Sequence, residues 1–318
     1  MNRRVTIIGT GNVGAATAFS LATQGLVNEM VLIDVKEKKS EADVLDLRDA
    51  TARLPVQLKL WANDWDRGVE SDIVIISAGP LPRPDQTRLD TLEDGKKIIN
   101  DIIPRLYTGG FGGIIINITN PCDVISHHIW LKARECGASP GSGGGNIFGT
   151  GTSLDSLRLR RILAELCGVA PSSVEGYSMG EHGDSQMVPW SQIRIGGKPF
   201  LELREAESRI KKEDLANLVY KTSYAGWEVL LRKGYTNYGI ATATADLVRA
   251  VCNDEKRIVP VAALLRGEYG LSDLHIGVPA VIGAAGVEKI VELDLSAEEL
   301  GLFHKSAELI KSYIAKLN

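Results

Sequence analysis

Short apolar runs alternate with stretches of helical periodicity through the first half of the chain. The runs are rich in β-branched residues, and the helical stretches repeat apolar positions every three or four residues. The runs are Val5–Ile8, Met30–Val35, Asp72–Ser77 and Gly113–Thr119, and the clearest helical stretches are Ala15–Gln24 and Leu92–Leu106. Continuous apolar strands that alternate with helices are typical of a parallel sheet buried on both faces. The pattern therefore predicts a doubly wound α/β fold with right-handed crossovers.

A low-complexity stretch, "SPGSGGG", interrupts this alternation at Ser139–Gly145. Such a composition is typical of a flexible loop and marks a candidate domain boundary. We therefore expect one domain over residues 1–145 and a second, mixed α/β domain over residues 146–318.

The second half predicts another order of elements. A strand-rich stretch is expected up to Phe200, between the first and second of three helices. Helical periodicity covers Ser153–Leu166, Glu213–Lys233 and Tyr238–Val251, and strand-like runs cover Ile258–Arg266 and Ala280–Leu293. Ser296 and Glu299 have the spacing of a capping box at the start of a last helix. The apolar residues of that helix keep one face, which we expect to dock on the protein's own body.

Composition and charge narrow the function classes. The chain of 318 residues is 44% hydrophobic and carries a net charge of −4 with scattered basic residues, which argues against nucleic acid as a partner. No apolar run is long enough to span a membrane, and the first residues enter a strand pattern without a signal peptide. The sequence therefore predicts a cytoplasmic protein with no nucleic-acid or membrane partner.

The cysteines carry no sign of a metal site. The four are Cys122, Cys136, Cys167 and Cys252, and they show neither C-x-x-C pairing nor metal-ligand spacing. We expect reduced thiols and no bound metal.

A nucleotide-binding motif follows the first strand. "VTIIGTGNVGAATA" places Gly9, Gly11 and Gly14 as G-x-G-x-x-G between a strand and a helix, and Asp34 ends the next strand twenty residues after Gly14. The first glycine permits a tight turn, the second lets the backbone approach a pyrophosphate, and the third allows close packing of helix and strand. An acidic residue at the position of Asp34 accepts hydrogen bonds from a ribose and repels a 2′-phosphate. The motif therefore predicts a Rossmann domain that binds NAD through Gly9, Gly11, Asn12, Val13, Gly14 and Asp34.

One histidine stands apart from the other four. His182 lies in the small, polar stretch "SMGEHGDSQ", where it is either a loop histidine or a general acid/base. Asp155 could orient such an imidazole, and Arg158 lies one helical turn further on, although this spacing also fits a surface ion pair. The remaining histidines are expected to be structural or solvated.

Seven motifs occur in an order that identifies a family. They are "IIGTGNVG", "AG…TRLD", "NITNPCD", "FGTGTSLDSLR", "GEHGDS", "KGYTNYG" and "IGVPAVIGAAGVEKIVEL". Together they resemble the NAD-dependent L-lactate/malate dehydrogenase family over essentially the whole chain. The resemblance implies a Rossmann domain followed by a substrate domain, a homotetramer, and reversible hydride transfer between NADH and a small 2-oxo acid, with pyruvate favoured.

The resemblance also assigns roles to residues. His182 matches the proton donor and acceptor of the family, Asp155 its orienting carboxylate, and Arg158 the bidentate partner of the substrate carboxylate. Further matches are Arg88 as the arginine that polarises the substrate carbonyl on loop closure, Asn120 as the asparagine beside substrate and nicotinamide, Thr236 as a residue lining the pocket, and Ala78 and Gly79 as residues beside the cofactor.

The specificity position departs from the family pattern. Glutamine there resembles a lactate enzyme and arginine a malate enzyme, but this chain has Pro82, with Arg83 one place later. Two alternatives to a lactate enzyme therefore stay open. The proline could admit bulkier 2-oxo acids, as in 2-hydroxyisocaproate dehydrogenases, or Arg83 could turn inward and bind a second carboxylate, as a malate enzyme requires.

Regulation and two rival classes complete the expectations. Gln192 stands where members activated by fructose bisphosphate often carry a histidine, so such activation is not predicted. An NAD-dependent glycosidase shares the cofactor fold but uses a metal held by Cys and His, which this sequence does not suggest. An NAD-binding sensor without activity has little need for the combination of His182, Asp155, Arg158 and Arg88.

Overall fold

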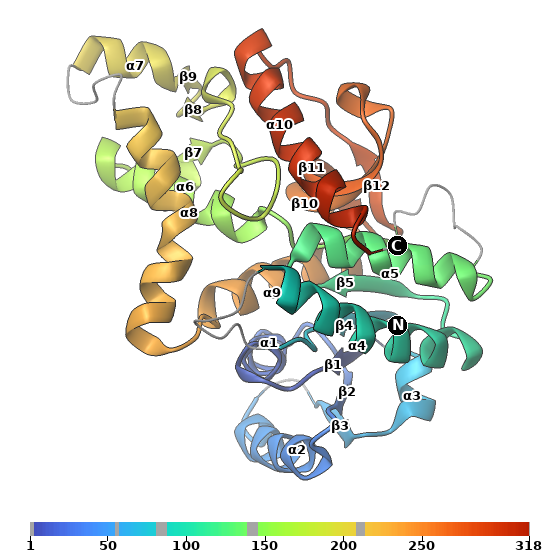
Figure 1. Cartoon of the computed structure of the whole chain (residues 1–318). Coiled ribbons are helices and arrows are strands. Elements are labelled where there is room, and N and C mark those ends of the chain that lie inside the picture. The colour runs from blue at the N-terminus through green and yellow to red at the C-terminus, as the bar shows by residue number, and fades with distance from the viewer. Residues whose placement is uncertain (1–2, 55–56, 81–87, 139–145, 208–213, 318) are drawn as a thin grey trace.

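A nine-stranded sheet runs through the centre of the molecule (Figure 1). The computed structural model describes residues 3–54, 57–80, 88–138, 146–207 and 214–317. The strand order is β12-β11-β10-β6-β5-β4-β1-β2-β3. The parallel part consists of β1 (Arg4–Ile8), β2 (Glu29–Ile33), β3 (Lys59–Ala62), β4 (Ile73–Ile76), β5 (Ile114–Asn117) and β6 (Ile147–Gly149). The antiparallel part consists of β10 (Arg257–Arg266), β11 (Ser272–Gly283) and β12 (Gly286–Ile290).

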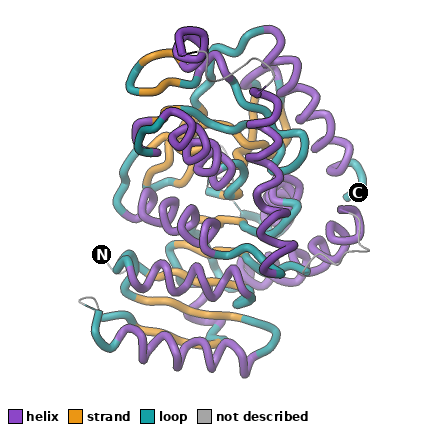
Figure 2. Tube along the Cα trace, turned by 90° about the vertical axis from the view of Figure 1, so that its left-hand side faces the viewer, coloured by secondary structure: helices purple, strands orange, loops and turns teal. Residues whose placement is uncertain are grey.

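Helices enclose this sheet, as the purple and orange segments of Figure 2 show. They are α1 (Asn12–Thr23), α2 (Glu37–Thr51), α3 (Trp65–Val69), α4 (Arg88–Thr108), α5 (Cys122–Glu135), α6 (Ser153–Cys167), α7 (Phe200–Glu207), α8 (Asp214–Lys233), α9 (Tyr238–Cys252) and α10 (Ala297–Ile314). A small antiparallel sheet of β7 (Val174–Glu175), β8 (Arg194–Ile195) and β9 (Lys198–Pro199) lies near α6 and α7 (Figure 1). None of the helices within the described ranges is both long and apolar enough to cross a bilayer.

The predicted α/β fold with a parallel, doubly wound sheet is confirmed. The four apolar runs of the first half form β1, β2, β4 and β5, whose residues are almost entirely buried. The expected helices of both halves are present as α1, α4, α6, α8 and α9. Strands covered by helices on both faces need no polar side, which is why these runs are continuously apolar.

Several elements differ from the prediction. The run Ala280–Leu293 is not one strand: β11 ends at Gly283 and the chain turns back into β12. β11 begins earlier, at Ser272, and includes His275, whose stretch was predicted to be strand-like. The strand-rich stretch before Phe200 contains only the two-residue strands β7, β8 and β9.

The sequences of α2 and α5 show no clear amphipathic periodicity, and the reasons are opposite. In α2, the only buried residues are Ser40, Val44 and Leu47, so most of the helix is polar. In α5, every residue from Cys122 to Trp130 is buried, so no polar face alternates with an apolar one.

The last helix docks on the protein's own body, as expected. Phe303, Ala307 and Ile310 of α10 are fully buried, and the helix packs on α5 and β11. The predicted capping box is present, because the side chain of Ser296 accepts from the Glu299 amide while Glu299 accepts from the Ser296 amide.

Four strands of the parallel part end at the same level. Ile8 of β1 pairs with Ile76 of β4, Ile76 with Asn117 of β5, and Asn117 with Gly149 of β6. The loops that follow these strands therefore emerge side by side at one edge of the sheet, which is where open α/β sheets bind ligands.

The histidines expected to be structural are built into the fold. His275 is fully buried and its Nε2 lies 3.2 Å from the carbonyl oxygen of Ile147, while its ring packs against that of His127. His128 bonds to Asn100 at 2.9 Å, and His304 bonds to the carbonyl oxygen of Tyr269. Burial lowers the pKa of His275 to about 3, and the pKa of His127 and of His128 to about 4.

These pKa values predict a loss of stability in mild acid. The unfolded chain binds protons at His127, His128 and His275 as the pH falls below about 6.5, whereas the folded chain resists them until about pH 4 or 3. Each site therefore removes up to about 1.4 kcal/mol of unfolding free energy per pH unit within that window. Urea unfolding midpoints measured between pH 7 and pH 4.5 should fall, and His275→Gln should make the fall less steep. An identical slope in wild type and variant would contradict this account.

Candidate active site

The glycine loop between β1 and α1 has the close contacts that its motif requires. Gly9 has a φ of +93°, and a Cβ on it would lie 2.5 Å from the amide nitrogen of Ala78. A Cβ on Gly14 would lie 1.9 Å from the carbonyl oxygen of Gly9. Side chains are thus excluded at both positions, by backbone conformation at the first and by helix–loop packing at both.

The first turn of α1 is open to an anion. Gly11 is the N-cap residue, no side chain caps the helix, and a Cβ on Gly11 would meet nothing within 4 Å. The amides of Asn12, Val13 and Gly14 lie in that first turn, where N–H groups have no partner within the helix. This arrangement fits a pyrophosphate at the helix N-terminus.

Asp34 follows β2 beside the same loop. One carboxylate oxygen accepts from the Thr10 amide at 2.7 Å, and the other accepts from the Lys36 amide at 2.9 Å. The Thr10 hydroxyl also donates to Oδ2 at 3.3 Å, whereas Oδ1 accepts, among the described residues, only from the Lys36 amide and so keeps a lone pair for a ribose hydroxyl. The residues predicted for NAD therefore fit the cofactor.

The loops after β4 and β5 are tied together at the edge of the sheet. Thr119 donates its hydroxyl to the carbonyl oxygen of Ala78 at 2.9 Å, and a Cβ on Gly79 would lie 2.6 Å from the Thr119 methyl. Asn120 follows as an exposed residue, joined to Pro121 by a cis peptide bond. Ala78 thus lies against Gly9 of the glycine loop, and Gly79 lies against Thr119, the residue before Asn120.

His182, Asp155 and Arg158 are brought together in space. The Nδ1 atom of His182 lies 2.6 Å from Oδ2 of Asp155, and Arg158 donates through Nη1 to Oδ1 at 3.1 Å. The side chain of Asp155 is 1% exposed, whereas those of Arg158 and His182 are 15% and 26% exposed. A buried carboxylate therefore joins two cationic side chains that both reach the surface.

The electrostatics of this cluster favour a charged pair. Burial alone would lower the pKa of His182, but the charge of Asp155 and the hydrogen bond to it raise that pKa above its ordinary value. Burial alone would raise the pKa of Asp155, but His182 and Arg158 hold it below its usual range. A histidine held ready as a proton donor is the chemical consequence.

Of the other residues predicted to contact the substrate, Thr236 lies within the described part of the chain. Thr236 lies half-buried in the turn between α8 and α9. A Cβ on Gly226 of α8 would lie 3.4 Å from Nη2 of Arg158, so α8 passes directly over the arginine. Pro82 and Arg83 lie outside the described residues. Arg88 is the first residue of α4, and its side chain also lies outside them.

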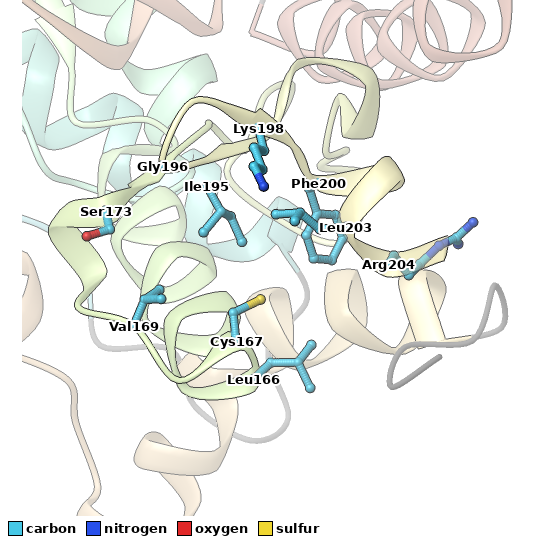
Figure 3. A pocket seen from close by; sticks show the side chains of 10 residues that line it. All are labelled: Leu166, Cys167, Val169, Ser173, Ile195, Gly196, Lys198, Phe200, Leu203 and Arg204. Atoms are coloured by element: carbon cyan, nitrogen blue, oxygen red, sulfur yellow. The ribbon is translucent and has the colours of Figure 1, made fainter. Parts of the chain in front are cut away.

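A separate apolar cavity shares no residue with this cluster. It measures about 370 Å³ and lies between the end of α6, the strands β8 and β9, and α7 (Figure 3). Half of its ten lining residues are aliphatic or aromatic, and its two charged residues are Lys198 and Arg204, of which the charged end of Arg204 points away from the cavity. None of the residues predicted for the active site lines this cavity.

Sequence reasoning assigned no role to Asp123 or Ser306. Asp123 accepts from the backbone amide of His182 at 2.8 Å, and Ser306 of α10 accepts from the neighbouring amide of Glu181 at 2.7 Å. Asp123 stands in the quoted motif "NITNPCD", three residues after Asn120, which was the available signal. Ser306 lies in a helix with no motif, and only the packing of α10 reveals it.

Comparisons with known proteins agree with this geometry. Residues 3–136 match the model of the lactate/malate dehydrogenase NAD binding domain, and residues 152–318 match that of the lactate/malate dehydrogenase alpha/beta C-terminal domain. The chain belongs to the lactate/malate dehydrogenase family. Residues 3–136 of this dehydrogenase therefore belong to an NAD binding domain.

The similar proteins include L-lactate dehydrogenases and a malate dehydrogenase. The chain is 42% identical to L-lactate dehydrogenase 3 of Bacillus thuringiensis over 98% of this chain and 97% of that one. The structure of a minor L-lactate dehydrogenase from Enterococcus mundtii superposes with a TM-score of 0.94 at 36% identity, covering 100% of this chain and 99% of that chain. A malate dehydrogenase from Cryptosporidium parvum superposes with a TM-score of 0.92 at 30% identity, covering 100% and 99%. The fold of this dehydrogenase is thus common to both activities.

The glycine loop gives a prediction that separates binding from folding. Gly11→Ala fits the fold, because its Cβ meets open space, but it occupies the approach to the pyrophosphate. It should weaken NADH binding at least about tenfold, equivalent to about 1.4 kcal/mol, and leave the melting temperature unchanged. Gly14→Ala should lower the melting temperature as well, because its Cβ clashes with Gly9.

Fluorescence titration with NADH and thermal unfolding measure the two quantities. Gly301→Ala, at an exposed position of α10, is the control and should leave NADH binding unchanged. Unimpaired NADH binding by Gly11→Ala would exclude the pyrophosphate from this loop.

Proposed function

We propose that this protein is an L-lactate dehydrogenase that reduces pyruvate with NADH and oxidises L-lactate with NAD. The observation that carries the proposal is the cluster of His182, Asp155 and Arg158 beside the edge where the glycine loop lies. The 42% identity to an L-lactate dehydrogenase over nearly the whole chain supports the choice of substrate. In this scheme residues 1–145 bind the nucleotide and residues 146–318 supply the catalytic groups.

The proton comes from His182. When bound, NADH supplies the hydride that reduces the carbonyl carbon. Because Asp155 holds Nδ1 of His182, Nε2 is the nitrogen left to give a proton to the carbonyl oxygen. The raised pKa of His182 keeps the imidazole protonated before the reaction, and the negative charge of Asp155 holds the ring in place after it.

Substrate binding falls to the arginines and the pocket residues. Arg158 uses one N–H group on Asp155 and retains four for the substrate carboxylate, which a planar guanidinium binds in a bidentate manner. Arg88 is proposed to polarise the carbonyl, with Asn120 and Thr236 lining the pocket. A 2-oxo acid offers the matching carboxylate and carbonyl groups.

Two alternatives concern the substrate side chain. Pro82 provides no polar contact at the specificity position, which would suit a broader L-2-hydroxy acid dehydrogenase of the 2-hydroxyisocaproate type. Arg83 could pair with a second carboxylate, which would suit malate, and the likeness to a malate dehydrogenase keeps this alternative open.

We further propose a cytoplasmic homotetramer. Large apolar side chains are exposed along α8 at helical spacing, namely Tyr220, Tyr224, Trp227 and Leu231, with exposed fractions of 57%, 39%, 49% and 73%. A contiguous exposed stripe of this kind is typical of an association surface.

The catalytic cluster predicts a split between turnover and affinity. His182→Ala should lower kcat for pyruvate about 10²-fold to 10⁴-fold and leave NADH binding intact, because only proton transfer is lost. Arg158→Lys should raise KM for pyruvate about tenfold to a hundredfold, because bidentate binding is lost. His304→Ala, at a histidine of α10 that bonds to the carbonyl oxygen of Tyr269, should change neither constant. Full turnover by His182→Ala would refute the assignment.

Substrate choice is tested by kcat/KM for pyruvate, 2-oxoisocaproate and oxaloacetate, in wild type and Arg83→Ala. Pyruvate should lead, and the variant should differ less than about fivefold, since pyruvate has no second carboxylate for Arg83 to bind and a surface ion pair contributes at most about 1 kcal/mol. Should oxaloacetate lead and collapse in Arg83→Ala, the enzyme is a malate dehydrogenase. Should 2-oxoisocaproate lead, it is of the broader type.

The assembly is tested by light scattering. The mass should be about four times the 34.4 kDa of one chain. Leu231→Glu should lower it by placing a charge in the α8 stripe, whereas Leu302→Glu, exposed on α10, should not. A wild-type protein with the mass of one chain would refute the proposed homotetramer.

A further inference from the structure

Four different elements hold the loop that carries His182. Asp155 of α6 binds its ring, and Asp123 of α5 accepts from its backbone amide at 2.8 Å. Ser306 of α10 accepts from the amide of Glu181, and the backbone of Gly180 pairs with that of Gly277 in β11. Of these anchors, only Asp155 and Asp123 place a carboxylate next to the histidine.

A buried carboxylate is an unusual acceptor for a single backbone amide, yet Asp123 has this role toward His182. Its side chain is buried, at 2% exposure for the residue, and Oδ1 has no hydrogen-bond partner among the described residues. Burial raises the pKa of Asp123 to about 7, although the amide and the charge of His182 act to lower it. A neutral acceptor such as the hydroxyl of Ser306 holds the adjacent amide without this cost.

The charges that face His182 come from two helices and its own loop. Asp155 and Asp123 favour the protonated ring, while Arg158 opposes it. Glu181, in the same loop as His182, acts on Asp123 by raising its pKa. The second carboxylate therefore offsets the arginine that the substrate requires.

We propose that Asp123 is a positioning residue for the reaction, one that fixes the backbone amide of His182 and supplies a second negative charge favouring the imidazolium. This inference rests on the proposed function, in which His182 donates the proton. Asp123 also lies three residues after Asn120, so one junction between β5 and α5 aligns both the asparagine and the histidine. Because a proton on His182 favours the ionised form of Asp123, the two groups titrate as a coupled pair.

The test compares Asp123→Asn with Ser306→Ala. The asparagine can still accept from the His182 amide but carries no charge. The pKa of His182 should therefore fall, and the alkaline limb of pyruvate reduction should move to lower pH, with a rate at pH 8 about threefold to tenfold below wild type. Ser306→Ala removes a neutral anchor of the same loop, so it should lower kcat without moving that limb. Identical pH profiles for Asp123→Asn and wild type would overturn the proposal.

Two further measurements keep the outcome clear. The His182 pKa is read from the ¹³C-labelled imidazole by NMR, with the signal identified by its loss in His182→Ala. This titration needs no substrate, so a wild type that fails to reduce pyruvate would refute the proposed function, whereas an unchanged histidine pKa in Asp123→Asn would refute this inference. If Asp123→Asn does not fold, the labelled carboxyl of Asp123 in wild type must titrate in the same pH range as His182, or the coupling is absent.

Discussion

The carboxylate of Asp155 is the interaction on which the active site depends. It is buried in the first turn of α6, and its two oxygens are divided between the imidazole of His182 and the guanidinium of Arg158. A buried carboxylate without partners would be protonated or would destabilise the fold. Two cationic partners keep it ionised, and in return it fixes the position of both. The groups proposed to bind the substrate and to protonate it therefore share one anchor.

The sheet brings this anchor to the cofactor loop. Because β1, β4, β5 and β6 end in register, the glycine loop, the Ala78 loop, the Asn120 loop and the start of α6 lie along one edge. The antiparallel strands β10 and β11 then extend the same sheet, and β11 pairs with the loop of His182. One continuous core thus connects the glycine loop with the loop of His182, and α8 covers Arg158 from the other side.

Much of the fold followed from local patterns. β1, β2, β4 and β5 are continuous apolar runs because both of their faces are buried, and a run of that kind is visible without any partner. The bounds of α2, α5 and β11 were harder to predict because their burial departs from the usual amphipathic pattern: α2 is mostly polar, α5 is buried all round from Cys122 to Trp130, and β11 buries the polar His275. Sequence periodicity reveals an element when an apolar face alternates with a polar one, and these three elements show little of that alternation.

The sequence by itself determined the family and the glycine loop that is proposed to bind the nucleotide. The roles of Gly9, Gly11, Gly14 and Asp34 depend on a turn and a helix that neighbouring residues build, so their spacing carries the information. Only the tertiary structure decided how the loop of His182 is held. His182 meets Asp155 across 27 positions and Asp123 across 59, while Ser306 meets Glu181 across 125. Contacts of that separation are set by how helices pack on the sheet, and no local spacing encodes them.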